Sequence, residues 1–221
     1  MLDGSNHIWM QPWVGNNYPT RRLLIVGESA YDDPANNYCV NPRTNIDIIG
    51  EEVKGTHANI HKSQKQIARI VCDSREPNYA AFWESVAFYN FVQTGLLSRE
   101  SQQQIVAALP RSKSAFAGLV GLANAPVLKP RPTHIVAIGT SVTWEEMPPC
   151  TYTAQTWAYA LQGYKYSDGT IGLATVINHP GMRRRYPFEK MAERIRLFLR
   201  LKPDECSVRE LLSSESASLF Q

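Results

Sequence analysis

The polar residues best suited to chemistry follow an apolar run near the start of the chain. The run LLIV at 23–26 leads directly into Gly27, Glu28 and Ser29. A carboxylate in such a turn can orient water or stabilise a cationic transition state. The same composition is also typical of a loop of turn-forming acids with no chemical role. The candidate residues here are Glu28, Ser29, Tyr31, Asp32 and Asp33.

A second candidate follows another apolar run, IGLATVIN at 171–178. His179 comes next, and Pro180 and Gly181 then favour a turn. A neutral imidazole held there can donate a hydrogen bond to an anionic leaving group, although a lone histidine is more often structural. Asn90 lies in the aromatic sequence FYNF, where its amide can read a donor and an acceptor at once or cap a turn.

The positive charge of the chain is local. The formal net charge of +3 does not by itself indicate a polyanionic partner. Arg183, Arg184 and Arg185 are consecutive, however, and Lys129 and Arg131 flank a proline just before an apolar run. Such residues can bind phosphates by Coulomb attraction and counterion release, and ordinary solvated charge is an equally good interpretation of them.

Four short segments, taken in order, resemble the motifs of the uracil-DNA glycosylase superfamily. They are GESAY at 27–31, FYN at 88–90, HIVAIGTS at 134–141 and NHPGM at 178–182. That superfamily has a water-activating motif after its first strand, an asparagine that reads the base edge, a strand that ends in glycine, and a His-Pro motif before a minor-groove loop. The resemblance covers residues 21–200, and the order and spacing of the segments carry it.

This resemblance implies a DNA glycosylase that uses neither a metal nor a cofactor. Such enzymes flip a uracil-like or modified pyrimidine out of DNA and hydrolyse its N-glycosidic bond, which leaves an abasic site. By this resemblance, Glu28 and Ser29 would line the water site. Tyr31 would lie against the base and Asn90 would hydrogen-bond it. His179 would stabilise the departing base anion.

The resemblance also implies how DNA would be held. Met182 would be a wedge that enters the duplex. Arg183, Arg184 and Arg185 would bind phosphates, so DNA is the expected partner.

The first motif departs from the usual pattern of that superfamily. Ser29 stands where Asp or Asn is common, and Ala30 stands where Pro usually follows. Because a hydroxyl is a poor base at neutral pH, Asp32 or Asp33 would be the alternative water activator. The altered motif and the long segment 28–55 indicate a pocket for a larger or modified pyrimidine. A hypermodified phage base such as glucosylated hydroxymethylcytosine, removed in antiviral defence, would suit such a pocket.

Two other classes of function stay open on the sequence. The first is a nucleic-acid-binding module of the same fold that does not cleave, which Ser29 and Ala30 favour. The second is a hydrolase or transferase that acts on a free nucleoside or another small phosphorylated molecule. No glycine-rich phosphate-binding motif follows any apolar run, which weighs against the second class.

The candidate residues need elements that place them, and three apolar runs predict buried strands at 21–26, 133–139 and 171–178. A fourth strand, or a tight turn, is expected at 88–92. Helices are expected at 56–72, from Pro77 or Asn78 through Phe82, Trp83 and Val86, at 98–109, at 112–123, at 140–147 and after Pro187. Residues 28–55 show little periodicity and are expected to form a long loop.

Strands that alternate with helices predict an α/β fold of three layers, α/β/α, with a mainly parallel central sheet. The resemblance implies the uracil-DNA glycosylase-like form of this fold. Ligands of such folds bind at the carboxyl ends of the strands, which is where both candidate segments lie. Residues 1–202 are expected to form one domain that begins with an irregular arm, and residues 203–221 a tail that is free to move.

Composition restricts the class of protein. Hydrophobic residues make up 43% of the 221 residues and charged residues 19%, which favours a globular chain. No run reaches the length of a membrane helix, and the N-terminus lacks a signal sequence. The cysteines form no C-x2-C metal motif. We therefore expect a cytoplasmic protein with free thiols, no metal, no membrane contact and no obligate protein partner.

Overall fold

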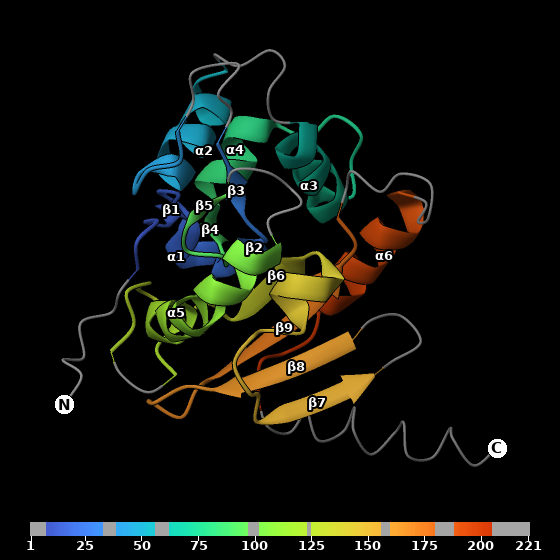
Figure 1. Cartoon of the computed structure of the whole chain (residues 1–221). Helices are drawn as coiled ribbons and strands as arrows, with labels where there is room; N and C mark the ends of the chain where they lie inside the picture. Colours follow the sequence, from blue (N-terminus) through green and yellow to red (C-terminus); the bar gives the residue numbers. More distant parts are fainter. Residues whose placement is uncertain are drawn as a thin grey trace.

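Four apolar segments form the parallel centre of a seven-stranded sheet in the computed structural model (Figure 1). In spatial order they are β4 (Val86–Asn90), β2 (Leu23–Gly27), β6 (His134–Ile138) and β9 (Ile171–Ile177). They are buried along almost their whole length, as expected of strands with helices on both faces. The strands predicted at 21–26, 133–139 and 171–178 are confirmed, and the predicted segment 88–92 overlaps β4.

Antiparallel strands extend this parallel centre on both sides. β1 (Trp13–Val14) pairs with β4, while β8 (Ala160–Lys165) pairs with β9 and β7 (Tyr152–Gln155) pairs with β8. A separate parallel pair, β3 (Ala30–Tyr31) and β5 (Gly95–Leu96), joins the loops that follow β2 and β4. The structure describes residues 8–32, 39–55, 62–96, 102–122, 125–155, 160–179 and 188–204.

Helices pack on both faces of the sheet. One face is covered by α2 (Thr44–Lys54), α3 (Lys62–Cys72), α4 (Tyr79–Glu84) and α6 (Phe188–Phe198). The other face is covered by α5 (Gln102–Val120), and the short α1 (Tyr18–Arg21) contributes Tyr18 to the same core. In Figure 1, α5 lies on the opposite side of the sheet from α2, α3 and α4.

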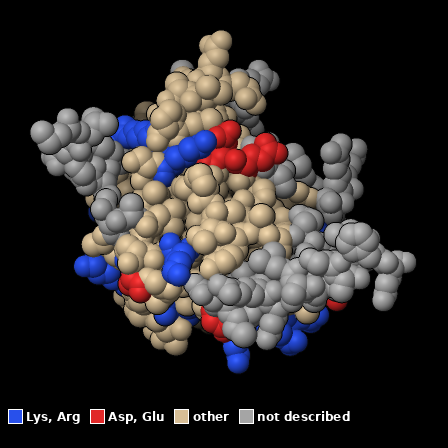
Figure 2. Space-filling model, turned by 90° about the horizontal axis from the view of Figure 1, so that it is seen from below, with Lys and Arg blue, Asp and Glu red and all other residues tan. Residues whose placement is uncertain are grey.

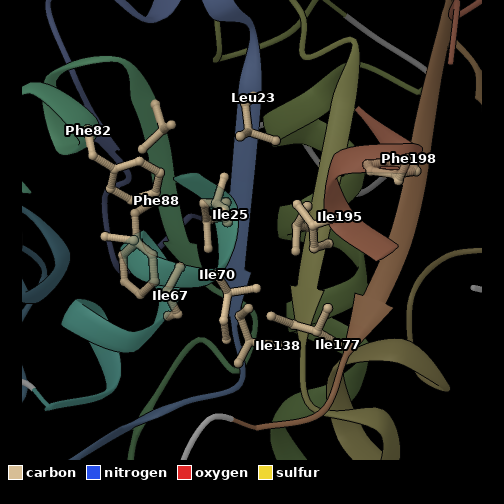
Figure 3. Close-up of a cluster of buried hydrophobic side chains, with 14 of the residues drawn as sticks. Leu23, Ile25, Ile67, Ile70, Phe82, Phe88, Ile138, Ile177, Ile195 and Phe198 are labelled. Atoms are coloured by element: carbon tan, nitrogen blue, oxygen red, sulfur yellow. The ribbon is translucent and has the colours of Figure 1, made fainter. Parts of the chain in front are cut away.

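Two apolar cores hold these layers together. Leu23 and Ile25 of β2 point into the core that α3, α4 and α6 complete, and Figure 3 shows them beside Phe88, Ile138 and Ile195. The residues between them, such as Leu24, belong to the core on the α5 side. Burial of each such side chain contributes about 1.5–3 kcal/mol relative to its exposure to water.

The helices predicted within 56–72, from Asn78 and after Pro187 are confirmed as α3, α4 and α6. The Asn78 side chain caps α4, because its Oδ1 accepts a hydrogen bond of 3.0 Å from Ala81 N. Val86 was expected in this helix, but it begins β4 instead. The helix ends at Glu84, and the Ser85 hydroxyl binds Phe82 O at its end.

The segment 28–55 contains a helix, so the prediction of a long loop is wrong for its second half. α2 ends at Gly55, whose φ of 68° lies in the left-handed region that glycine adopts without strain. Three of the buried positions of α2 are polar, namely Thr44, Asn45 and Glu52. Polar residues at buried positions break the apolar periodicity by which a helix is recognised.

Two predicted helices, 98–109 and 112–123, form the single helix α5, which contains Pro110. Proline removes one backbone N–H and normally ends or kinks a helix. Pro110 lies on the exposed side of α5, where water can bind the carbonyl oxygen that loses its donor. The helix predicted at 140–147 is a π-helical turn, η2 (Thr140–Trp144).

The strands β7 and β8 were not predicted from the sequence. Their residues alternate between the two cores, because Leu161 faces the α3 and α6 side while Tyr164 faces the α5 side. Gly163 lies opposite Tyr152 in the register, and a Cβ on Gly163 would lie 3.0 Å from the Tyr152 ring. The ring of one strand therefore fills the place of a side chain on its neighbour.

The N-terminal arm contains regular elements, β1 and α1, where an irregular segment was predicted. Among the described residues no helix is both long enough and apolar enough to span a membrane. Cys39, Cys72 and Cys150 are free thiols. Residues 205–221, most of the predicted tail, lie outside the described residues.

Candidate functional site

The four parallel strands end level with one another. Val26, Ala137 and Val176 are neighbours in register across β2, β6 and β9, and Gly27 pairs with Asn90 of β4. We call the carboxyl ends of these four strands the carboxyl edge. Ligands of α/β proteins bind outside such an edge, because the loops there leave a crevice. The structure thus brings Asn90 to the place where chemistry is expected.

Glu28 and His179 extend the same edge. Glu28 follows the last residue of β2, and His179 lies two residues beyond β9. β6 separates the two strands, so the ends of β2 and β9 are two strand spacings, roughly 10 Å, apart. His179 itself is half-buried.

The Glu28 carboxylate lies against the end of β6. A Cβ on Gly139 would be 3.2 Å from Glu28 Oε2, and the φ of Gly139 is +99°. Glycine therefore allows both this backbone conformation and the approach of the carboxylate. Burial raises the pKa of the Glu28 carboxyl above its ordinary value, and no described residue offers it a hydrogen bond or an opposite charge. A carboxylate in this environment is a stronger base than an exposed one.

Asn90 is almost fully buried, and hydrogen bonds hold both its side chain and its backbone. Its Nδ2 donates a hydrogen bond of 2.9 Å to Asn45 Oδ1 in α2. Its backbone oxygen accepts a hydrogen bond of 2.7 Å from Gln93 Nε2. The Asn90 amide therefore has one fixed orientation at the carboxyl edge.

The absence of a side chain on Gly27 creates the space that Asn90 occupies. A Cβ on Gly27 would lie 2.5 Å from Asn90 Oδ1 and 3.1 Å from Phe88 Cζ. Both neighbours are held in place, since Phe88 is part of the apolar core and Asn90 is bonded to Asn45. Glycine at position 27 thus fits the steric need of the site.

Ser29 and Tyr31 lie just beyond the end of β2. The Ser29 Oγ is buried and has no hydrogen-bond partner among the described residues. A buried hydroxyl normally has such a partner, so this atom is suited to bind a polar group of a ligand. Tyr31 is half-buried in β3 and packs against the core on the α5 side.

Asp32 has a structural role, because it binds the backbone of two neighbouring segments. Its Oδ1 accepts a hydrogen bond of 2.7 Å from Val40 N, and its own N–H binds Leu96 O at 2.9 Å. Asp32 therefore fixes residues 39–40, which lead into α2. Asp33, the other substitute predicted for water activation, lies outside the described residues.

No protein-family model matches this chain, and no curated protein is similar to it in sequence. Its function must therefore be inferred from the residues at the carboxyl edge. Four of the predicted site residues, Met182, Arg183, Arg184 and Arg185, lie outside the described residues. In the part of the chain that is described, no three His, Cys, Asp or Glu side chains are grouped as a metal site requires.

Lys129 and Arg131, the other basic residues singled out from the sequence, precede β6 and so lie at the end of the sheet opposite the carboxyl edge. Arg131 precedes β6, forms an ion pair with Asp168, donates to Ser167 Oγ at 2.6 Å and stacks on Tyr166. These contacts give Arg131 a structural role rather than a role on phosphates. On the side of the molecule in Figure 2, the described Lys and Arg side chains are scattered and alternate with Asp and Glu.

Two residues at this site, Asn45 and Gln93, were not predicted from the sequence. Asn45 belongs to α2, which was not predicted, and Gln93 acts through side-chain bonds to distant backbone. The local signals that exist are weak. Gln93 follows Asn90 by three residues and comes directly after the apolar pair Phe91 and Val92, whereas Asn45 lies in a polar stretch of sequence.

Proposed function

We propose that this protein is a DNA glycosylase. It flips a uracil-like or modified pyrimidine out of DNA and hydrolyses the N-glycosidic bond, which leaves an abasic site. The observation that carries the proposal is the carboxyl edge, where three strand ends contribute a carboxylate, an amide and an imidazole. Glu28, Asn90 and His179 supply these groups.

Each of the three groups has a distinct task in this reaction. Asn90 hydrogen-bonds the edge of the flipped base. Glu28 orients the attacking water and stabilises the positive charge that develops on the sugar. His179 donates a hydrogen bond to the departing base anion.

Among the acids considered for water activation, Glu28 is the best supported. The Asp32 carboxylate already accepts a bond from Val40 N. Ser29 carries a hydroxyl, which is a poor base at neutral pH. Glu28 combines a raised pKa with a carboxylate that no described residue neutralises. The chemistry we propose runs on these side chains and needs no metal.

The nature of the target base is also part of the proposal. Ser29 stands where superfamily members commonly have an acid or an amide, and its buried hydroxyl has no partner in the described part of the chain. A base with added polar groups, such as glucosylated hydroxymethylcytosine, would offer hydrogen bonds to it. Removal of such a base from phage DNA would make the protein part of an antiviral defence in the cytoplasm.

The test is to incubate the purified protein, with a chelator, on DNAs that carry uracil, cytosine, hydroxymethylcytosine or glucosylated hydroxymethylcytosine. Alkaline cleavage detects abasic sites, and mass spectrometry identifies the released base. We expect release of one pyrimidine. DNA binding with no release from any substrate would support a binding module instead. Release from free nucleosides alone, with no DNA affinity that weakens as salt rises, would support a small-molecule hydrolase.

A further inference from the structure

A chain of hydrogen bonds determines which atom of Asn90 faces the site. Asn45 Nδ2 donates to the backbone oxygen of Gln11 at 2.9 Å. A carbonyl oxygen can only accept, so this bond fixes which end of the Asn45 amide is nitrogen. Asn45 Oδ1 must then be an acceptor, and the atom of Asn90 that meets it at 2.9 Å must be Nδ2.

The orientation of the Gln93 amide, which binds the backbone oxygen of Asn90, follows in the same way from its partners. Its Oε1 accepts hydrogen bonds of 2.9 Å from both Trp9 N and Met10 N, which can only donate. Its Nε2 therefore faces the other way and donates to Asn90 O at 2.7 Å. Gln93 is 1% exposed, so water does not compete for these bonds.

The N-terminal arm thus binds both residues that hold Asn90. Residues 9–11 contribute two backbone N–H groups to Gln93 and one backbone oxygen to Asn45. Asn45 is fully buried. The arm is far from Asn90 in sequence, but through Asn45 it fixes the orientation of the Asn90 side chain, and through Gln93 it holds the Asn90 backbone oxygen.

The remaining polar atom of Asn90 is its Oδ1, which lies over Gly27. No described residue donates a hydrogen bond to this oxygen. Since the bond to Asn45 keeps the amide from rotating, Oδ1 stays in place as an acceptor.

We infer that Asn45 and Gln93 are positioning residues that fix Asn90 with its oxygen as the acceptor, so the bound base presents an N–H group to Asn90 Oδ1. The identity of that ligand as a base rests on the proposed function, whereas the orientation of the amide does not. A ring imino N–H or an exocyclic amine on a pyrimidine would meet this requirement.

The orientation is tested first without any activity. In an NMR spectrum of the whole protein, the side-chain N–H signals of Asn90 are assigned by their loss in Asn90→Ala. We expect these protons to exchange with water far more slowly than those of Asn78, whose side chain is exposed. Asn45→Leu should speed the exchange at Asn90 at least tenfold, while Asn78→Ala leaves it unchanged. Equally fast exchange at Asn90 and Asn78 in the unmodified protein would overturn the inference.

A double-mutant cycle then tests the positioning role in base release. Asn45→Leu should lower the single-turnover rate about 10- to 100-fold in the presence of Asn90, the range expected for loss of a base-reading contact. In an Asn90→Ala background the same change should have no further effect. An equal loss in both backgrounds would show that Asn45 has only a structural role.

Thermal unfolding of each variant separates misfolding from loss of position. If Asn45→Leu does not fold, Gln93→Met replaces it in the cycle, since it removes the bond to Asn90 O and keeps the length of the side chain. Slow exchange at Asn90 with no base release would contradict the proposed function but leave the positioning role intact. Base release together with fast exchange at Asn90 would support the proposed function and contradict the positioning role.

Discussion

At the scale of single residues, the environment of Glu28 decides what it can do. The Glu28 carboxylate is half-buried, none of the described residues places a cation beside it, and desolvation raises its pKa. The missing side chain of Gly139 leaves space for this carboxylate at the end of β6. A raised pKa is what a general base needs, because it moves the pKa towards the working pH.

This environment predicts the pH dependence of base release. The reaction needs the ionised carboxylate, so the rate should fall as the pH drops through the Glu28 pKa. Because that pKa lies above the ordinary value of 4.5, the fall should begin at a higher pH than an exposed glutamate would give. Glu28→Gln should lower the rate about 100-fold or more and abolish this dependence. Single-turnover rates across the acidic range, with folding checked by circular dichroism, provide the measurement, and an unchanged acidic limb in Glu28→Gln would contradict it.

The sequence identifies those site residues that lie next to a strand end. Glu28 and His179 directly follow apolar runs, and Asn90 ends one, so a local pattern suffices to place them at one edge. Asn45 and Gln93 have no such pattern, because each depends in part on hydrogen bonds to the backbone of residues 9–11, more than 30 residues away along the chain. The structural role of Asp32 was equally hidden, since it depends on where Val40 lies.

At the scale of elements, strands buried on both faces are the most predictable part of this fold. β2, β6 and β9 are continuous apolar runs, because each has a core on both sides. α2 was missed because several of its buried positions are polar, among them Asn45, which binds the N-terminal arm and Asn90. α5 was predicted as two helices because a proline normally ends a helix. The sequence alone does not show that Pro110 faces solvent, where water can replace the lost hydrogen bond.

The packing where β8 joins β9 predicts the effect of a substitution at Gly172 on stability. A Cβ at this position would overlap the hydroxyl of Tyr166, which is buried and donates to Pro132 O at 2.8 Å. Gly172→Ala must therefore displace a buried ring, which costs about 1–3 kcal/mol of unfolding free energy. Urea denaturation measures this cost. Gly169→Ala is no control, because its φ of +84° adds strain, whereas Thr170→Ser on the exposed turn keeps the hydroxyl that binds Asp168 and should change stability far less.

At the scale of the whole molecule, the sheet separates a stabilising end from a functional end. His134 begins β6 at the end opposite the carboxyl edge, and its Nε2 lies 3.0 Å from Leu201 O beyond α6. The carbonyl can only accept, so Nε2 carries a proton and donates this hydrogen bond. The ring also packs edge-on against Phe198. His134 thus joins the sheet to the end of the last helix.

This buried ring predicts how stability changes with pH. Burial lowers the pKa of folded His134 below its ordinary value of 6.5, so the unfolded chain takes up the proton first as the pH falls. The contribution of the neutral ring is therefore complete above pH 6.5 and declines between 6.5 and the lower folded pKa. In urea denaturation, the stability gap between the protein and His134→Gln should narrow as the pH falls through this window. A gap that widens would contradict the account.

Two histidines at opposite ends of the sheet test most directly whether the carboxyl edge is the active site. His179→Gln and His134→Gln are assayed for single-turnover base release on the DNA substrate that the protein cleaves. If the carboxyl edge is the active site, His179→Gln should lose about 100-fold or more of the rate. His134→Gln should keep the rate of the unmodified protein at a pH where both remain folded. Equal rates in the two variants, with or without loss, would contradict the assignment of catalysis to the carboxyl edge.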